Sequence, residues 1–170
     1  MDYLLRPWKL DDLDSLVLHA NNPRIAQFMT DAFPHPYTPD AGKKFIQYAT
    51  KDHTVHIFAI EVKGKAVGGI GIHPQQDVFR KNAEIGYWLG EAYWNTGIMT
   101  QALSQIVTIA FINLNFERVF ARPFSTNTAS QKVLEKCGFK MEAILKKTIY
   151  KDGLYLDELI YAKRKKELSI

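Results

Sequence analysis

The chain has 170 residues, which at roughly 100–200 residues per domain predicts one domain spanning residues 1–170. Hydrophobic residues make up 46% and charged residues 24% of the chain, average fractions for globular domains that exclude disordered and collagen-like classes. The formal net charge of +4 slightly favours an anionic ligand, but the basic residues are dispersed, so we expect no nucleic-acid surface.

Cysteine and histidine content bears on compartment and metal binding. The single cysteine, Cys137, cannot form an internal disulfide, which is typical of a reducing, cytoplasmic setting. The residues after Met1 show no signal-peptide pattern. The histidines, which include His53, form no ligand motif with acidic residues, so no metal is expected. The uncharged stretch 92–116 carries polar side chains at helical spacing, which predicts a helix packed on a sheet and no membrane contact.

The first half of the chain reads as a strand, several helices and then further strands. A short strand is predicted at 3–7. Residues of the type that caps helices then precede three apolar runs: Asp11, Asn22 and Thr38. Two β-rich runs, from Val55 to Val62 and from Ala66 to Ile72, flank a turn at 63–65 and predict antiparallel strands. A third strand is predicted at 81–89.

The second half contains a crossover and a hairpin. A helix at 98–114 between the strands 81–89 and 118–122 predicts a parallel strand–helix–strand unit. Asn127 is a candidate cap for a helix that ends near Lys136, with Gly138 suited to the left-handed residue after it. The runs 139–150 and 154–163 flank Asp152-Gly153, a strong hairpin signal. The order predicts an α+β fold with a largely antiparallel sheet.

One loop could bind an anion. Residues 93–100 join a strand to a helix start, where unpaired backbone N–H groups and the positive end of the helix dipole point toward one place and can hold a phosphate. The glycine spacing of neither the P-loop nor the dinucleotide-binding fold is present. An ordinary strand-to-helix connection would account for the segment equally well.

Two segments in order, AEIGYWLGEAYWNTGIMTQAL and NTASQKVLEKCGF, together spanning residues 83–139, resemble the acetyl-coenzyme A binding core of the GNAT acyltransferase superfamily. The similarity is to the branch that contains the RimJ/RimL-type protein N-acetyltransferases. It implies a GNAT-like fold, in which about four helices flank a mostly antiparallel sheet of six to seven strands. It also implies acetyl-coenzyme A as the cosubstrate.

The resemblance assigns the cofactor-binding positions. The pyrophosphate loop of the family falls on Trp94, Asn95, Thr96, Gly97, Ile98 and Met99. Asn95 and Met99 stand where the family usually has small residues, and Met99 is expected to lie beside the phosphates. The backbone amides of Leu89 and Gly90 are candidates to bind the developing oxyanion. Gly90 could instead simply end its strand.

The resemblance also assigns roles to three polar side chains. Glu84 matches the position of a general base, which is needed because an amine acceptor is protonated at neutral pH. Glu84 could equally face solvent or pair with Arg80 or Lys81. Asn127 matches a residue that contacts the pantetheine arm, unless it serves only as a helix cap. Ser130 matches a cofactor-binding residue near the sulfur of coenzyme A. It is also the candidate to protonate, or relay a proton to, the leaving thiolate, because Leu134 stands where many members have a tyrosine.

These assignments predict an N-acetyltransferase that moves acetyl from acetyl-coenzyme A to a primary amine by direct attack in a ternary complex. The acceptor is expected to be a peptide N-terminus or a small molecule, and the protein a monomer or homodimer. A second hypothesis is a coenzyme A-binding sensor or scaffold that has the fold without catalysis. A third is a basic interaction domain that binds nucleic acid with a steep salt dependence.

Overall fold

The structure is a computed structural model in which residues 2–51 and 56–167 are described. His53 and the predicted strand start at Val55 lie outside these residues. The helices and strands follow in the order β1 (Leu4–Pro7), α1 (Leu13–Ala20), α2 (Pro23–Ala26), α3 (Pro39–Ala49), β2 (His56–Val62), β3 (Lys65–Pro74), β4 (Asn82–Leu89), α4 (Ile98–Thr108), β5 (Arg118–Ala121), α5 (Thr128–Lys136), β6 (Lys140–Lys151) and β7 (Leu154–Arg164).

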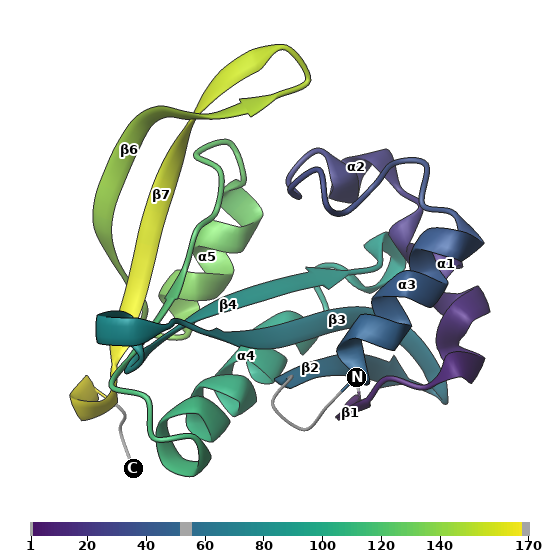
Figure 1. Ribbon diagram of the computed structural model, residues 1–170, viewed down its shortest axis with the longest axis horizontal. Coiled ribbons are helices and arrows are strands. Elements are labelled where there is room, and N and C mark those ends of the chain that lie inside the picture. Colours follow the sequence, from purple (N-terminus) through teal and green to yellow (C-terminus); the bar gives the residue numbers. More distant parts are fainter. Residues whose placement is uncertain (1, 52–55, 168–170) are drawn as a thin grey trace. The chain divides into compact units, whose positions relative to one another are not determined.

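The strands pair in the order β1-β2-β3-β4-β5-β7-β6. β4 and β5 are parallel and joined by α4, as the predicted crossover requires (Figure 1). The β1–β2, β2–β3, β5–β7 and β6–β7 pairs are antiparallel. The predicted α+β class is therefore confirmed, with seven strands and, within the described residues, five α-helices rather than about four. The additional helix is α2, which has only four residues.

The chain forms two compact units, one from residues 1–72 and 86–102 and the other from residues 73–85 and 103–170. β3, β4 and α4 each continue from one unit into the other. The single domain predicted from chain length stays a prediction. No helix within the described residues is both long and apolar enough to cross a membrane.

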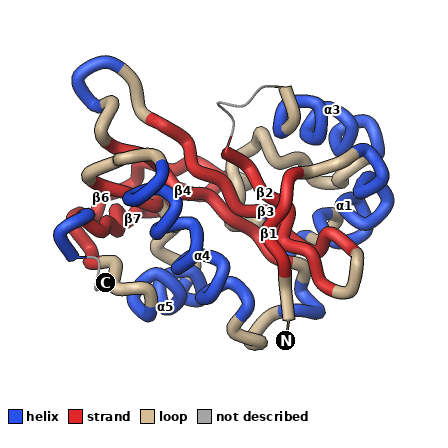
Figure 2. The backbone as a smooth tube through the Cα atoms, turned by 90° about the horizontal axis from the view of Figure 1, so that it is seen from below, coloured by secondary structure: helices blue, strands red, loops and turns tan. Residues whose placement is uncertain are grey.

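In the first unit, α1 and α3 lie side by side (Figure 2). A Cβ atom on Gly42 of α3 would lie 2.7 Å from a methyl group of Leu13 on α1, so glycine allows the two helices to approach closely. Their buried side chains join a core that includes Trp8, Leu16 and Ile46.

Two of the three predicted helix caps in this unit are confirmed. The side chains of Asn22 and Thr38 accept hydrogen bonds from the Arg24 and Ala41 amides, at 2.8 and 3.2 Å. The prediction for Asp11 is wrong, because a short 3₁₀ turn at Leu10–Asp12 precedes α1 and makes Asp12 the residue before the helix.

Asp12 itself does not cap α1 with its side chain. Its carboxylate is buried and accepts two 2.7 Å hydrogen bonds from the Arg6 guanidinium and a third, of 3.0 Å, from the Lys9 amide. A paired guanidinium is a stronger partner for a buried carboxylate than a helix amide is, because the bonds are charge-assisted. The predicted cap at Asp11 is therefore one residue too early because Asp12 contacts Arg6 of β1.

In the second unit, α5 lies along β7 (Figure 1), and the Tyr161 hydroxyl of β7 donates to the Glu135 carboxylate of α5 at 2.9 Å. Gly138 follows α5 with φ +79°, and the hairpin turn at Asp152 and Gly153 has φ values of 51° and 81°. Both turn predictions are confirmed, since these conformations favour Gly, Asn and Asp.

The predicted helix 98–114 changes its type before it ends. α4 is an α-helix to Thr108, and the chain continues as a π-helix at Ile109–Asn113. The wider π turn shifts which side chains face inward. Phe111 is fully buried, whereas its neighbour Ile112 is 53% exposed.

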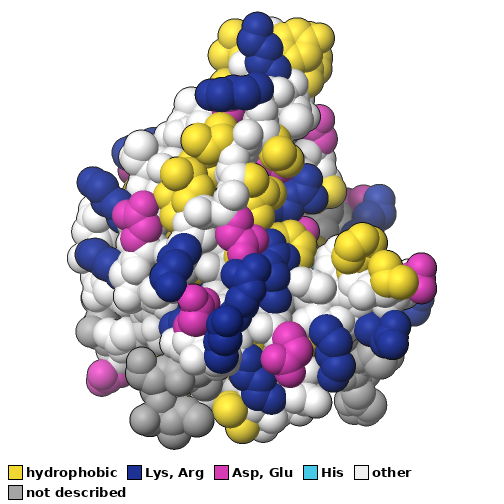
Figure 3. Space-filling model, turned by 90° about the vertical axis from the view of Figure 1, so that its left-hand side faces the viewer, with side chains coloured by type: hydrophobic (Ala, Val, Ile, Leu, Met, Phe, Trp, Pro, Cys, Tyr) yellow, Lys and Arg dark blue, Asp and Glu magenta, His cyan; other side chains and the backbone are white. Residues whose placement is uncertain are grey.

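The hairpin of β6 and β7 carries an irregular ladder. Its register shifts between Met141 and Ala143 and again between Leu145 and Ile149. Lys147, within the second shift, has φ 55°. Figure 3 shows apolar side chains at the surface of the molecule, and on this hairpin the exposed ones are Met141, Ile144, Leu145, Tyr150, Leu154 and Tyr155.

Candidate active site

The loop before α4 contains two residues in left-handed conformations, which an anion-binding turn can use. Asn95 and Gly97 both adopt left-handed conformations, with φ 61° and 82°, and both are exposed. Asparagine is among the few residues besides glycine that adopt this conformation readily, so Asn95 supplies the geometry that a glycine would. Left-handed residues in a turn can bring successive N–H groups onto one side, which forms an anion-binding concavity. The start of α4 at Ile98 adds the positive end of its dipole.

The larger side chains of this loop are engaged with the protein. The Trp94 indole N–H donates to the Leu89 carbonyl and the Thr96 hydroxyl donates to the Tyr93 carbonyl, both at 2.7 Å. Met99, like Ile98, is buried. The first turn of α4 turns the Met99 side chain toward the protein interior, and the expectation that it lies beside the phosphates stays a prediction.

A charged contact that the sequence did not indicate ties α2 to this loop. The Arg24 guanidinium lies over the Trp94 ring at 5.1 Å from its centroid and forms an ion pair with Glu91. Asn22, the cap of α2, also donates to the Glu91 carboxylate at 2.7 Å. The loop is thereby held from α2 as well as from the end of β4. These partners lie about 70 residues apart, and nothing local in the sequence marks them.

Gly90 permits a close approach at the end of β4. A Cβ atom there would lie 2.9 Å from the His19 imidazole Nδ1 and 3.0 Å from the Val67 carbonyl oxygen. The Gly90 amide donates to that carbonyl at 2.7 Å. The Gly90 amide is thereby engaged, and binding of an oxyanion by the Leu89 amide stays a prediction.

In the second unit, Glu84 lies in a cluster of three charged side chains. Its carboxylate, on β4, is half-buried, and Oε2 lies 4.0 Å from Nη1 of Arg122, just after β5. The Arg122 Nε in turn donates to Oε1 of Glu158 on β7 at 2.7 Å. Glu158 is only 6% exposed. β4 pairs with β5 so that Glu84 lies opposite Phe120, which places Arg122 on the same face two residues further along.

The alternative in which Glu84 pairs with Arg80 or Lys81 is wrong, because Arg122 is the cation beside its carboxylate and both neighbours in sequence bond elsewhere. The Arg80 guanidinium donates to the Asp77 carbonyl and the Lys81 ammonium to the Asn115 carbonyl, at 3.1 and 3.2 Å. Burial raises the pKa of the Glu84 carboxyl, the Arg122 charge opposes this rise, and the Glu158 charge adds to it. A carboxylate with a raised pKa is a stronger proton acceptor, and this suits a general base.

The start of α5 holds the other predicted polar residues. Oδ1 of Asn127 accepts a hydrogen bond from the Ser130 amide at 3.1 Å, so its capping role is confirmed. Ser130 is partly buried, and Leu134, one turn later, is fully buried. Leu134 therefore offers no hydroxyl group at the position where many family members have a tyrosine.

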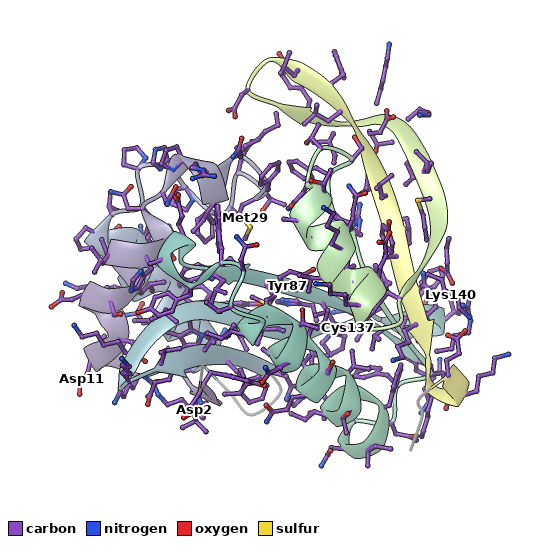
Figure 4. The ribbon with its side chains drawn as sticks, turned by 180° about the vertical axis from the view of Figure 1, so that it is seen from behind. Asp2, Asp11, Met29, Tyr87, Cys137 and Lys140 are labelled. Atoms are coloured by element: carbon purple, nitrogen blue, oxygen red, sulfur yellow. The ribbon has the colours of Figure 1, made fainter. Side chains whose placement is uncertain are left out.

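Cys137 lies at the end of α5 (Figure 4) and is buried. Its sulfur lies 3.5 Å from the Ser104 hydroxyl. Burial raises the pKa of the Cys137 thiol, so it is protonated at neutral pH, which fits a packing role rather than a nucleophilic one. Across residues 2–51 and 56–167, no group of three or more His, Cys, Asp or Glu side chains is arranged to hold a metal ion.

Comparison with known protein families shows which family the chain belongs to. The family model described as an acetyltransferase (GNAT) domain matches residues 2–140. The chain belongs to the GNAT acetyltransferase family. It is an acetyltransferase, and members of the GNAT family use acetyl-coenzyme A.

Individual relatives agree with this membership. The putative ribosomal N-acetyltransferase YdaF of Bacillus subtilis is 29% identical over 96% of this chain and 90% of its own. The uncharacterized N-acetyltransferase YoaA of the same organism is 33% identical over 56% of this chain, and this match spans about half of the relative, 54%. The structure of RimL, a ribosomal L7/L12 α-N-protein acetyltransferase in complex with coenzyme A, shares the fold with a TM-score of 0.85 and 23% identity over 95% of this chain and 93% of that one.

Proposed function

We propose that this GNAT acetyltransferase transfers acetyl from acetyl-coenzyme A to a primary amine, which attacks directly in a ternary complex without a covalent enzyme intermediate. The observation that carries the proposal is the conformation of the loop at Asn95 and Gly97, which fits the diphosphate of coenzyme A. Acetyl-coenzyme A would supply an acyl group activated as a thioester.

The residues of the two units would then have separate roles. The Trp94 amide already donates to the Glu91 carbonyl at 3.1 Å, so the backbone amides from Asn95 to Met99 are the ones that bind the diphosphate. Asn127 already uses its side-chain oxygen on the Ser130 amide, so its side-chain N–H₂ is the group that can donate to the pantetheine arm. The Leu89 amide stabilises the oxyanion that develops on the acetyl carbonyl.

Two side chains would handle the protons. Glu84 accepts a proton from the ammonium form of the acceptor, which frees the nitrogen lone pair for attack on the thioester carbonyl. As the carbon–sulfur bond breaks, the Ser130 hydroxyl donates or relays a proton to the departing thiolate. The products are an N-acetylated amine and coenzyme A.

The acceptor follows less directly from the fold. YdaF is named a ribosomal N-acetyltransferase, and its similarity over nearly the whole chain supports a peptide N-terminus as the acceptor. A small amine is the alternative within the same chemistry. We also propose a cytoplasmic protein, because a chain whose single cysteine, Cys137, is a free thiol is typical of a reducing compartment. Its oligomeric state, a monomer or a homodimer, stays a prediction.

Thermal unfolding with and without acetyl-coenzyme A tests the cofactor site. At about 100 times the dissociation constant, a ligand of the native state adds roughly 2.7 kcal/mol, so Tm is expected to rise by about 5–10 °C. Desulfo-coenzyme A should give a similar rise and ATP none. If neither coenzyme A compound raises Tm at saturating concentration, the proposed function is wrong.

Release of coenzyme A thiol with a panel of acceptors then separates the remaining possibilities. The panel holds peptides that begin with Ala or Ser beside small amines. Turnover of small amines alone would exclude the protein acceptor. Binding of acetyl-coenzyme A without turnover of any acceptor would favour the sensor or scaffold hypothesis.

Replacement of Gly97 by alanine is expected to weaken acetyl-coenzyme A binding. A Cβ atom costs about 1–2 kcal/mol in the left-handed conformation, and relaxation of the loop would lower the affinity about tenfold. Gly64→Ala is the matched control, because Gly64 has φ +80° and nothing lies within 4 Å of an added Cβ atom. Calorimetric titration should show the loss of affinity in Gly97→Ala alone, and an equal loss in both variants would contradict the assignment.

A further inference from the structure

The buried carboxylate of Glu158 is held firmly in place by its backbone. The residues on either side of it bond to the segment after β5: the Leu159 amide donates to the Pro123 carbonyl at 3.0 Å, and the Ser125 amide donates to the Asp157 carbonyl at 2.9 Å. Phe124 forms an isolated β-bridge with Glu158 itself. The segment that begins at Arg122 is therefore fastened to β7 on both sides of Glu158.

Arg122 lies between two carboxylates that compete for its charge. Its Nε donates to Glu158 at 2.7 Å, while Nη1 lies 4.0 Å from Glu84. An ion pair at hydrogen-bonding distance fixes the guanidinium on Glu158, and the longer separation leaves Glu84 in a looser ion pair with Arg122 that is too long for a hydrogen bond. The Glu84 carboxylate can therefore still exchange a proton. Its proton affinity depends on the positive charge of Arg122 and the negative charge of Glu158.

We propose that Arg122 is a positioning residue that sets the proton affinity of the Glu84 carboxylate, with the buried Glu158 as the anchor that fixes the guanidinium. The inference rests on the proposed function, in which Glu84 is the general base, and it adds two residues to that site. Arg122 and Glu158 are the charged groups that act on Glu84 from β5 and β7.

The arrangement predicts opposite effects for its two members. Replacement of Arg122 by glutamine leaves two carboxylates without a cation, so Glu84 holds its proton to higher pH. Replacement of Glu158 by glutamine keeps an oxygen that can accept the Arg122 hydrogen bond but removes the competing negative charge, so Glu84 loses its proton at lower pH. Neighbouring charges shift the pKa of a buried carboxyl group, and solvent screening at this half-buried site weakens their effect.

The experiment is the pH profile of kcat/KM with one amine acceptor, so that ionisation of the acceptor is common to all variants. The acid limb should move up by about 0.5–1 pH unit in Arg122→Gln, return toward wild type in Arg122→Lys, and move down in Glu158→Gln. Arg118→Gln is the matched control, because Arg118 lies at the other end of β5 and pairs with Glu142 at 2.6 Å. Its acid limb should stay at the wild-type position.

Titration of the Glu84 carboxyl carbon by NMR gives a second readout that does not depend on turnover, with the signal assigned by its loss in Glu84→Gln. Opposite displacements in Arg122→Gln and Glu158→Gln support the inference. Unmoved titrations, or displacement in the same direction, overturn it, even where activity falls. If Glu158→Gln does not fold, the Gln and Lys variants of Arg122 decide the question. Full activity of Glu84→Gln would refute the proposed base, while the NMR titration would still test the electrostatic arrangement.

Discussion

Glu84→Gln is expected to lower kcat/KM for amine acetylation by about a hundredfold or more at neutral pH, with the affinity for acetyl-coenzyme A unchanged. A positioned general base contributes typically about 10²–10⁴-fold, and glutamine keeps the size and polarity of the side chain while it removes the proton acceptor. Stopped-assay product formation and calorimetric titration of the cofactor would measure the two quantities separately.

The pH dependence of this defect also reports on the acceptor. Above the pKa of the amine no proton needs to be removed before attack, so the variant should approach the wild-type rate. For an α-amino group this recovery should begin near pH 8, and for a lysine side chain only above about pH 10. A defect that stays constant across this range would show that Glu84 acts in binding or structure rather than as the base.

Glu142→Gln is the matched control for this variant. Glu142 is also a partly exposed strand carboxylate in the second unit, and it pairs with Arg118 and Arg164 at 2.6 Å each. Its replacement removes one carboxylate beside arginines without touching the Glu84 cluster. The kcat/KM of Glu142→Gln should therefore stay close to that of the wild type.

Phe111→Ala is expected to lower the free energy of unfolding by about 3–5 kcal/mol. Phe111 is fully buried in the π-helix, and truncation of a buried phenylalanine loses transfer free energy and leaves a cavity. For a chain of this size the loss corresponds to a decrease in Tm of about 6–20 °C. If the two units unfold in separate transitions, the decrease should appear in the transition of the second unit, which contains Phe111.

The adjacent residue provides the control, because Ile112 is 53% exposed. Ile112→Ala should change the free energy of unfolding by no more than about 0.5 kcal/mol. Urea denaturation of both variants makes the comparison. Similar losses in the two would mean that the π turn does not orient the side chains as described.

Local signals in the sequence predicted much of the fold. The caps at Asn22, Thr38 and Asn127 bond to amides two or three residues away, so the residue type and its position were sufficient. The turn at Asp152-Gly153 is equally local. The prediction for Asp11 failed because the adjacent Asp12 is buried against Arg6 of β1, a pairing that the helix-capping pattern does not include.

The candidate site was predictable to the same limit. The loop from Trp94 to Met99 lies in one stretch of chain, and the left-handed Asn95 follows from its residue type. Arg122 and Glu158 are 36 residues apart, and only the register of the strands brings them together. In the sequence, Glu158 is therefore indistinguishable from any other polar residue of an alternating strand. A charged residue among apolar neighbours in a predicted inner strand is the signal that could have marked it.

The irregular ladder of the hairpin bears on how the protein behaves at high concentration. β6 is the last strand of the sheet order and has exposed apolar side chains such as Met141 and Ile144, a combination that invites another chain to add a strand. The two register shifts and the left-handed Lys147 interrupt the row of backbone groups that such a strand would need. A bulged edge of this kind protects against aggregation, while its side chains stay accessible to solvent.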